Sequence, residues 1–197
     1  RNHTLILALA LVLLIGAVFY FRSDTKLPEK ISPKQVAENA LNNGDFGQMD
    51  KKPHPLSIES LKAGEYPGSE LILEQELPNG SNYKRQIVSY KSEGLKIYAL
   101  LTIPLSGPPA GGYPVVVFNH GFIPPAEYRT TERYIAYTDA FSRNGYILIR
   151  PDYRGHGNSE GEASGGYGSN NYTIDVLNVL ESIKKYPGVN PEKIGMW

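Results

Sequence analysis

The sequence contains no cysteine, so disulfide bonds and thiolate metal sites are excluded within these 197 residues. It has no excess of either charge, because 20 lysine and arginine residues balance 20 aspartate and glutamate residues. Basic clusters extend no further than pairs such as Lys51-Lys52, which argues against nucleic acid as a partner. Internal repeats and low-complexity tracts are also lacking. The remaining composition, 41% hydrophobic and 20% charged, is typical of one globular domain with an appendage.

One apolar run dominates the start of the chain, from Leu5 to Phe21, and it is 17 residues long. That length lies at the lower end of the range for a membrane-spanning helix, about 17–25 residues. The aromatic residues at 19–21, followed by Arg22, are typical of a membrane–water interface and offer no small-residue cleavage site. A transmembrane anchor over residues 1–22 is the favoured interpretation, and a cleaved signal peptide or a buried core helix are the alternatives. We expect the rest of the chain on the extracytoplasmic side of the membrane.

Residues 23–69 are polar and interrupted by prolines, which predicts a spacer between the anchor and a folded domain. One short helix is expected to begin at Ser32-Pro33, because serine is a favoured N-cap and proline a favoured first helical residue. It is expected to end before Asn43-Gly44. His54 lies between two prolines and is expected in a solvated loop, not at a ligand site.

Residues 70–197 alternate between strand-like and helix-like segments, which predicts the α/β fold class. Short β-branched runs bounded by glycine turns indicate strands at 70–77, 86–90, 95–103, 113–119, 146–150 and 193–197. Apolar stripes at helical spacing indicate helices at 131–144 and 171–186. The central strand–helix–strand succession predicts a mostly parallel sheet with flanking helices. Because such sheets bind ligands at the carboxyl ends of their strands, the loops after 113–119 and 146–150 are expected to form one site.

Four stretches in this order resemble the start of an α/β-hydrolase catalytic domain: LKIYALLTIP, PVVVFNHGF, NGYILIRPDYRGHGNSEG and NPEKIGMW. The sequence is most similar to the prolyl-oligopeptidase-like branch, which contains serine peptidases and esterases. In that family a Gly-x-Ser-x-Gly elbow carrying the nucleophile follows a strand like KIGMW, and the acid and the histidine come later. The resemblance, over residues 71–197, implies an N-terminal portion of a hydrolase that stops before the nucleophile and is inactive alone.

The resemblance also implies the chemistry of the whole enzyme. A serine hydrolase would cleave a small ester or a peptide through an acyl-enzyme, without a metal or an organic cofactor. Only the spacer lies between the predicted anchor and Glu70, so the β-propeller of prolyl oligopeptidases does not fit. A shorter esterase or small-peptide hydrolase is therefore as well supported as an oligopeptidase. The alternatives are a non-catalytic homologue acting as a membrane-tethered binding domain, and a hydrolase with an aspartate nucleophile.

The stretch His120-Gly121-Phe122 matches the oxyanion loop of that family. Acyl transfer passes through a tetrahedral oxyanion, and one of its two backbone N–H donors comes from the loop after a central strand. The resemblance assigns this donor to Phe122, with Gly121 allowing the backbone to approach the substrate. It leaves His120 a structural role, because the catalytic histidine of the family lies further downstream.

A second match to Gly-x-Ser-x-Gly, at 157–161, is not expected to be the nucleophile elbow. An elbow serine directly follows a buried strand and precedes a helix, whereas Ser159 comes nine residues after Arg150 in a polar loop. Asp152 and Arg154 are expected to bind each other or the loop backbone.

His156 is likewise expected to be an ordinary loop residue. A metal site formed by His156 with Asp152 and His120 is not expected, because their spacing matches no standard site. Several of the 14 tyrosines could line a substrate pocket or simply pack, notably Tyr128, Tyr153, Tyr167 and Tyr172.

Overall fold

The computed structural model describes residues 32, 34 and 53–197. The predicted anchor at Leu5–Phe21 and nearly all of the helix predicted to begin at Ser32-Pro33 lie outside this part of the chain. No helix among the described residues is both long enough and apolar enough to span a membrane. Residues 52–197 form a compact unit.

This unit contains one six-stranded sheet with the strand order β1-β2-β3-β5-β4-β6. The strands are β1 (Ile72–Leu77), β2 (Tyr83–Ser92), β3 (Leu95–Pro104), β4 (Tyr113–Val117), β5 (Ile147–Pro151) and β6 (Val189–Met196). The helices are α3 (Ile58–Ala63), α4 (Ile135–Arg143) and α5 (Asn171–Lys184). Every strand and helix predicted between residues 70 and 197 is present, with ends that differ by up to four residues.

The sheet is mixed, and the prediction of a mostly parallel sheet is wrong. β4 pairs in parallel with β5 on one side and with β6 on the other, whereas β1, β2 and β3 form an antiparallel meander. β3 then joins β5 in antiparallel fashion, with Leu101 opposite Ile149. The connections explain this difference. Strands joined by a tight turn such as Glu93-Gly94 run antiparallel, whereas parallel strands require a longer crossover that contains a helix.

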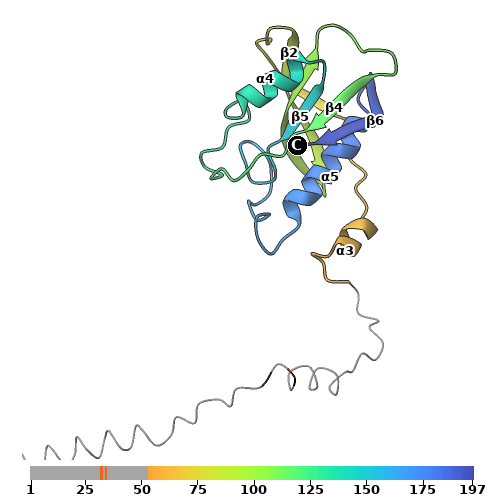
Figure 1. The fold of residues 1–197 in the computed structure, drawn as a ribbon. Helices are drawn as coiled ribbons and strands as arrows, with labels where there is room; N and C mark the ends of the chain where they lie inside the picture. Colours follow the sequence, from red (N-terminus) through yellow and green to blue (C-terminus); the bar gives the residue numbers. More distant parts are fainter. Residues whose placement is uncertain (1–31, 33, 35–52) are drawn as a thin grey trace, which may run out of the picture. The chain divides into compact units, whose positions relative to one another are not determined.

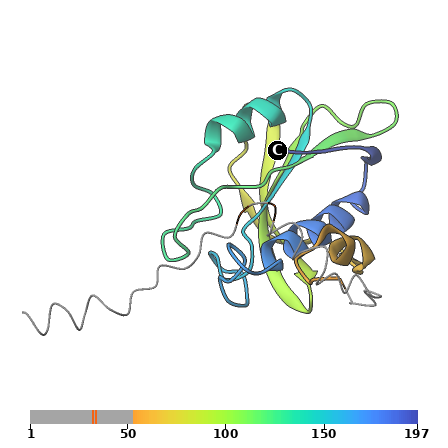
Figure 2. The same ribbon diagram turned by 60° about the horizontal axis from the view of Figure 1, so that its bottom comes forward.

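Helices α4 and α5 cover opposite faces of the sheet (Figures 1 and 2). Side chains alternate along each strand, so one strand supplies both faces. Ile147 and Ile149 of β5 belong to the apolar cluster that contains Val179 of α5. On the other face, Thr102 of β3 is hydrogen-bonded to Ser142 of α4, with 2.7 Å between the hydroxyl oxygens. β5 is therefore buried on both sides, as its continuous apolar sequence predicts.

The short helix α3 lies in the stretch predicted to be a spacer, and it was not predicted. Ser57 is its N-cap, and its hydroxyl accepts a hydrogen bond of 3.2 Å from the backbone N–H of Ser60. None of the residues of α3 is buried. His54, before the helix, is exposed, as expected.

The end of β6 lies beside the end of β4. The backbone N–H of Trp197 donates to the carbonyl of Val117 (3.0 Å), and the N–H of Asn119 donates to the carbonyl of Trp197 (2.8 Å). The C-terminus, marked C in Figure 1, thus meets the loop that begins at Asn119.

Candidate active site

Two loops come together at the carboxyl ends of the parallel strands. The loop at 119–122 follows β4, and the loop that begins at Asp152 follows β5. The hydroxyl of Tyr153 donates to the carbonyl oxygen of His120 at 3.2 Å, and the two rings stack with centroids 4.2 Å apart. The parallel pairing of β4 with β5 brings these loops to one edge of the sheet.

Four aromatic rings form a column that joins the two loops. Tyr128 stacks on His120 with centroids 4.7 Å apart, and Tyr172 stacks on the far side of Tyr153 at 5.0 Å. The ring of His156 contacts all four of these rings at steep angles. The column buries both faces of the His120 imidazole, so this ring has a fixed position.

His120 is neutral over the physiological range. Its imidazole is buried, and this burial lowers its pKa from 6.5 to about 4. Nδ1 lies 2.8 Å from the carbonyl oxygen of Gly121. Because a carbonyl oxygen can only accept, the proton of the neutral ring resides on Nδ1.

Side chains hydrogen-bond to both backbone groups of Gly121 in the loop at 119–122. The N–H of Gly121 donates to the hydroxyl of Tyr134 (3.1 Å), and the carbonyl of Gly121 accepts from His120. Within residues 53–197, the backbone N–H of Phe122 has no hydrogen-bond partner, and the Phe122 side chain is 89% exposed. In a trans peptide the N–H points opposite to the preceding carbonyl. His120, by holding that carbonyl, therefore fixes the direction in which the Phe122 N–H points.

A cavity of about 420 Å³ opens beside this loop, lined by Asn119, His120, Tyr153, Gly165, Gly166, Tyr172, Thr173 and Val176. Its volume is within the range of small-molecule sites, about 300–1,000 Å³. Of the four tyrosines predicted as pocket candidates, Tyr153 and Tyr172 line it. Tyr128 is buried behind His120, and Tyr167 is fully exposed.

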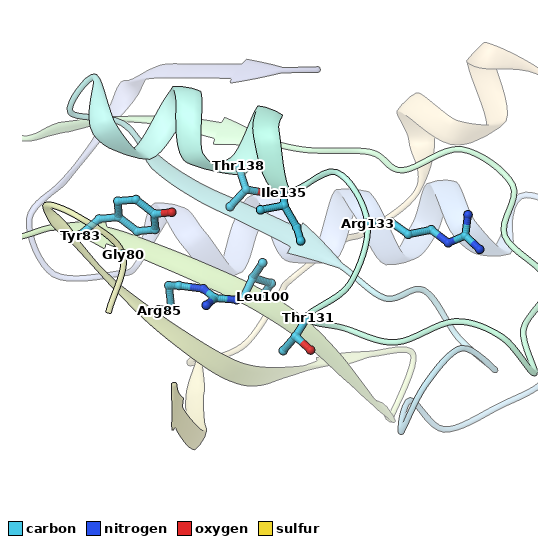
Figure 3. Close-up of a pocket in the computed structure, with 8 residues that line it drawn as sticks. All are labelled: Gly80, Tyr83, Arg85, Leu100, Thr131, Arg133, Ile135 and Thr138. Carbon is cyan, nitrogen blue, oxygen red and sulfur yellow. The ribbon is translucent and has the colours of Figure 1, made fainter. Parts of the chain in front are cut away.

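A second, smaller cavity of about 130 Å³ lies on the α4 face, between that helix and strands β2 and β3 (Figure 3). Tyr83, Arg85 and Thr138 are among the residues that line it. None of the residues of the loop at 119–122 lines it, whereas Asn119 and His120 line the cavity of about 420 Å³, which is therefore the candidate substrate site.

Asp152 and Arg154 do not bind each other, contrary to one of the predicted possibilities. The carboxylate of Asp152 accepts hydrogen bonds from Tyr128 (2.8 Å) and Thr130 (2.5 Å) and is fully buried. Burial raises the pKa of Asp152 to about 6, against the lowering effect of these two hydroxyl donors. Asp152 thus anchors the segment that carries Tyr128 against His120 of the loop at 119–122.

Arg154 forms an ion pair with Asp175 of α5, with 2.8 Å between Nη2 and Oδ1. The Asp175 carboxylate also accepts from the backbone N–H of Arg154 (2.9 Å) and from the hydroxyl of Ser92 (2.6 Å). Glu93 approaches the same guanidinium at 2.9 Å from an exposed position. This network ties the loop after β5 to α5 and β2.

Ser159 does not stand on a strand-to-helix turn. β5 ends at Pro151 and α5 begins at Asn171, so Ser159 lies within the long connection. Its Oγ accepts a hydrogen bond of 2.9 Å from the backbone N–H of Tyr98, at the antiparallel part of the sheet. Nδ1 of His156 lies 3.1 Å from the carbonyl of Arg154. Among the described residues, no three histidine or carboxylate side chains are placed to hold a metal ion.

Arg150 is a residue of this region whose role the sequence analysis missed. It is the largest of the fully buried side chains and ends the apolar run of β5. Its guanidinium donates to three carbonyl oxygens of one turn, those of Thr130 (2.5 Å), Arg133 (2.8 Å) and Glu132 (3.1 Å). The sequence does place a charged residue at the end of a strand that was predicted to be buried. Because a buried charge requires hydrogen-bonding partners, this position could have indicated such a role.

No family model and no curated protein matches this chain. Solved structures do match. The hypothetical protein PA2218 from Pseudomonas aeruginosa is 22% identical, with a TM-score of 0.51, over 66% of this chain and 40% of its own. An acetyl xylan esterase from Paenibacillus sp. R4 is 18% identical, with a TM-score of 0.49, over 71% and 48%. The α/β hydrolase GrgF from Penicillium sp. sh18 is 21% identical, with a TM-score of 0.46, over 61% and 37%.

The chain spans less than half of the length of each of these proteins. The match to PA2218, the mixed sheet and the helix on each face decide the fold class. The chain has an α/β-hydrolase-like fold. In α/β hydrolases one oxyanion donor comes from the loop after a central strand, and the nucleophile stands on the turn after another strand. In this chain the loop at 119–122 follows the central strand β4.

Proposed function

We propose that this chain is the N-terminal part of a serine hydrolase that cleaves small esters or peptides through an acyl-enzyme. The observation that carries the proposal is the backbone N–H of Phe122. It has no partner among residues 53–197, and it belongs to the loop after the central strand β4, whose residues Asn119 and His120 line a cavity of about 420 Å³. A fixed, unpaired donor at that place is what stabilisation of an oxyanion requires.

The nucleophile is proposed to follow Trp197 directly. The carbonyl of Trp197 accepts from the N–H of Asn119, so the next residues of the chain would begin next to the oxyanion loop. A serine on a turn there would face both the Phe122 N–H and the cavity. Ester chemistry is also what the name of the Paenibacillus structure states for that protein.

In the proposed reaction, the serine Oγ attacks the carbonyl carbon of the substrate while a histidine takes its proton. The negative charge that develops on the carbonyl oxygen is bound by the Phe122 N–H and by the N–H that follows the nucleophile. The histidine returns the proton to the leaving group, and water then releases the acyl group. The serine, the histidine and the acid all belong to residues beyond Trp197, and no metal or organic cofactor takes part.

Neither His120 nor Ser159 is the catalytic group in this proposal. Both faces of the His120 ring are covered, and its protonated Nδ1 is committed to the Gly121 carbonyl. Ser159 accepts from the N–H of Tyr98, away from the oxyanion loop. We assign His120 the role of orienting the peptide unit that carries the Phe122 N–H.

Proline at position 122 tests the oxyanion role, because it removes the N–H and the phenyl side chain together. Phe122→Ala is the matched control, since it keeps the N–H and loses only an exposed ring. In the full-length protein we expect Phe122→Pro to lower kcat on a small ester by roughly 10²–10³-fold. Phe122→Ala is expected to stay within a few-fold of the wild type. Equal activity of the two variants would contradict the proposal.

The membrane anchor over residues 1–22 is a separate proposal, supported by the apolar run Leu5–Phe21. Deletion of these residues is expected to move the protein from the membrane fraction to the soluble fraction without changing ester hydrolysis. A protein that stays in the membrane fraction after the deletion would contradict the anchor but not the catalytic proposal.

A further inference from the structure

The N–H of Gly121 does not face a substrate, because the hydroxyl of Tyr134 accepts its hydrogen bond at 3.1 Å. Tyr134 is the N-cap residue of α4, 13 positions further along the chain. Its hydroxyl also occupies the space next to Gly121, since a Cβ added there would lie 3.2 Å from the hydroxyl oxygen. A residue outside the oxyanion loop thus controls one of the loop's backbone groups.

The backbone around Tyr134 is strained. Tyr134 has φ 52° and ψ 22°, and Arg133 before it has φ 56°, so two successive non-glycine residues adopt the left-handed conformation. This conformation is sterically unfavourable for residues other than glycine. Helix N-caps are normally extended and provide a side-chain acceptor, whereas Tyr134 makes no capping bond. Strain of this kind persists only where the surroundings impose it, and it concentrates at functional sites.

The surroundings that impose it are built around Arg150. Its guanidinium binds the carbonyl of Arg133 (2.8 Å) and two others in the same turn, and it lies 5.9 Å from the centre of the Tyr134 ring. The ring of Phe118, in the backbone stretch between β4 and the loop, packs against Tyr134 with centroids 5.3 Å apart. A buried charge and an aromatic contact therefore hold the Tyr134 hydroxyl against the loop.

We propose that Tyr134 is a positioning residue for the oxyanion donor. The peptide unit between His120 and Gly121 is held at both ends: its carbonyl accepts from Tyr153 and its N–H donates to Tyr134. The next peptide unit carries the Phe122 N–H and is joined to the first through the Gly121 Cα alone. The His120 ring holds the carbonyl of this second unit, and the Tyr134 hydroxyl holds the N–H of the first. Loss of the hydroxyl would therefore leave the direction of the Phe122 N–H to the His120 contact alone. This inference rests on the proposed function of Phe122.

Tyr134→Phe in the full-length protein removes the hydroxyl and keeps the ring. Tyr137→Phe is the matched control, because Tyr137 lies on α4, is half exposed, and its hydroxyl has no hydrogen bond within residues 53–197. We expect Tyr134→Phe to lower kcat on a small ester by roughly 10-fold, with KM changed by less than about 3-fold. The affinity for a boronic acid transition-state analogue should fall by the same factor as kcat/KM. Tyr137→Phe should change neither quantity.

A readout that does not depend on catalysis is the Gly121 amide itself. Labelling with ¹³C-carbonyl histidine and ¹⁵N-glycine selects His-Gly pairs, which occur in this sequence only at 120–121 and 156–157. Tyr134→Phe should speed hydrogen exchange of the Gly121 amide by about 10-fold or more, whereas the Gly157 signal serves as the internal reference. Gly121→Ala should interact with Tyr134→Phe, because it acts on the same contact, so their effects on kcat should not be additive.

Together, kcat and the hydrogen exchange of the Gly121 amide distinguish a failure of the Tyr134 proposal from a failure of the proposed function. Faster exchange at Gly121 together with the loss of kcat supports the proposal. Unchanged exchange, or faster exchange with wild-type kcat, overturns the positioning role and leaves the proposed function intact. A wild-type protein that neither turns over esters nor reacts with a serine-directed reagent overturns the proposed function, and with it the role of Tyr134.

Discussion

Nδ1 of His120 lies 2.8 Å from the carbonyl oxygen of Gly121, in the peptide unit whose N–H belongs to Phe122. This contact connects the aromatic column to the donor on which the proposed function depends. A histidine next to a catalytic site invites assignment as the general base. Here the ring is buried, neutral and already hydrogen-bonded to the backbone, so we propose that it orients a donor and does not exchange protons with a substrate.

Asparagine in place of His120 should preserve part of this function, because its amide N–H can reach the Gly121 carbonyl, whereas alanine cannot. We expect kcat of the full-length enzyme to fall roughly 10-fold in His120→Ala and less in His120→Asn. Since the pKa of His120 is about 4, the pH–rate profile above pH 5 should keep its apparent pKa in both variants. A profile that loses its acid limb in His120→Asn would show that His120 is the base.

The stability of the fold should depend on pH through two groups with opposite signs. Burial raises the pKa of Asp152 from 3.8 to about 6, so the folded state binds the proton more tightly and stability falls as pH rises from about 4 to 6. Burial lowers the pKa of His120 from 6.5 to about 4, so the unfolded state binds the proton more tightly and stability rises over nearly the same interval. Each contribution is about 3 kcal/mol, so the two largely offset each other.

Variants separate these contributions. Relative to the wild type, the unfolding free energy of Asp152→Asn should rise by about 3 kcal/mol from pH 4 to pH 6, and that of His120→Asn should fall by a similar amount. Urea unfolding of the three proteins at a series of pH values provides the comparison. Parallel curves for all three would contradict the assignment of either pKa.

The ion pair of Arg154 and Asp175 should be important for stability because both side chains are buried. Asp175→Asn leaves the guanidinium without a countercharge inside the protein, and we expect a loss of about 3–5 kcal/mol in unfolding free energy. Glu93→Gln is the control: its carboxylate contacts the same guanidinium but is exposed, so the loss should be at most about 1 kcal/mol. Similar losses in the two variants would contradict the burial argument.

Ser159 should affect stability and not chemistry. Ser159→Ala removes the acceptor of the Tyr98 N–H, so we expect a loss of about 1–3 kcal/mol in thermal or urea unfolding. The kcat of the full-length protein should remain within about 3-fold of the wild type. Loss of all turnover in a folded Ser159→Ala protein would make the loop at 157–161 a nucleophile site after all.

The positions of the strands could be predicted from the sequence, but the way in which the strands pair could not. Continuous apolar runs such as 146–150 and the polar ends that follow them predicted the strands and the edge at which the loops meet. The sequence indicated three strands with short turns between them at β1, β2 and β3. The prediction of a mostly parallel sheet did not include their antiparallel pairing. Helix α3 was missed because six residues are too few to show a helical period in the sequence.

The contacts that shape the loop at 119–122 could not be predicted, because they join residues that are distant in the sequence. Nothing local in the sequence indicates that Tyr134 reaches back to Gly121, or that Arg150 binds three carbonyls of the turn before Tyr134. Of the two contacts expected for Asp152 and Arg154, with each other or with the loop backbone, the first was wrong for the same reason. Asp152 accepts from Thr130 and Arg154 pairs with Asp175, and both partners come from distant parts of the chain.

The central claim is a serine nucleophile immediately after β6, and covalent labelling tests it most directly. The full-length protein would be treated with a fluorophosphonate reagent, digested, and the modified residue located by mass spectrometry. We expect a single modified serine within about five residues after Trp197, in a Gly-x-Ser-x-Gly turn. Modification at Ser159, or no modification of the folded protein, would contradict the claim, and the second result would favour a non-catalytic binding domain.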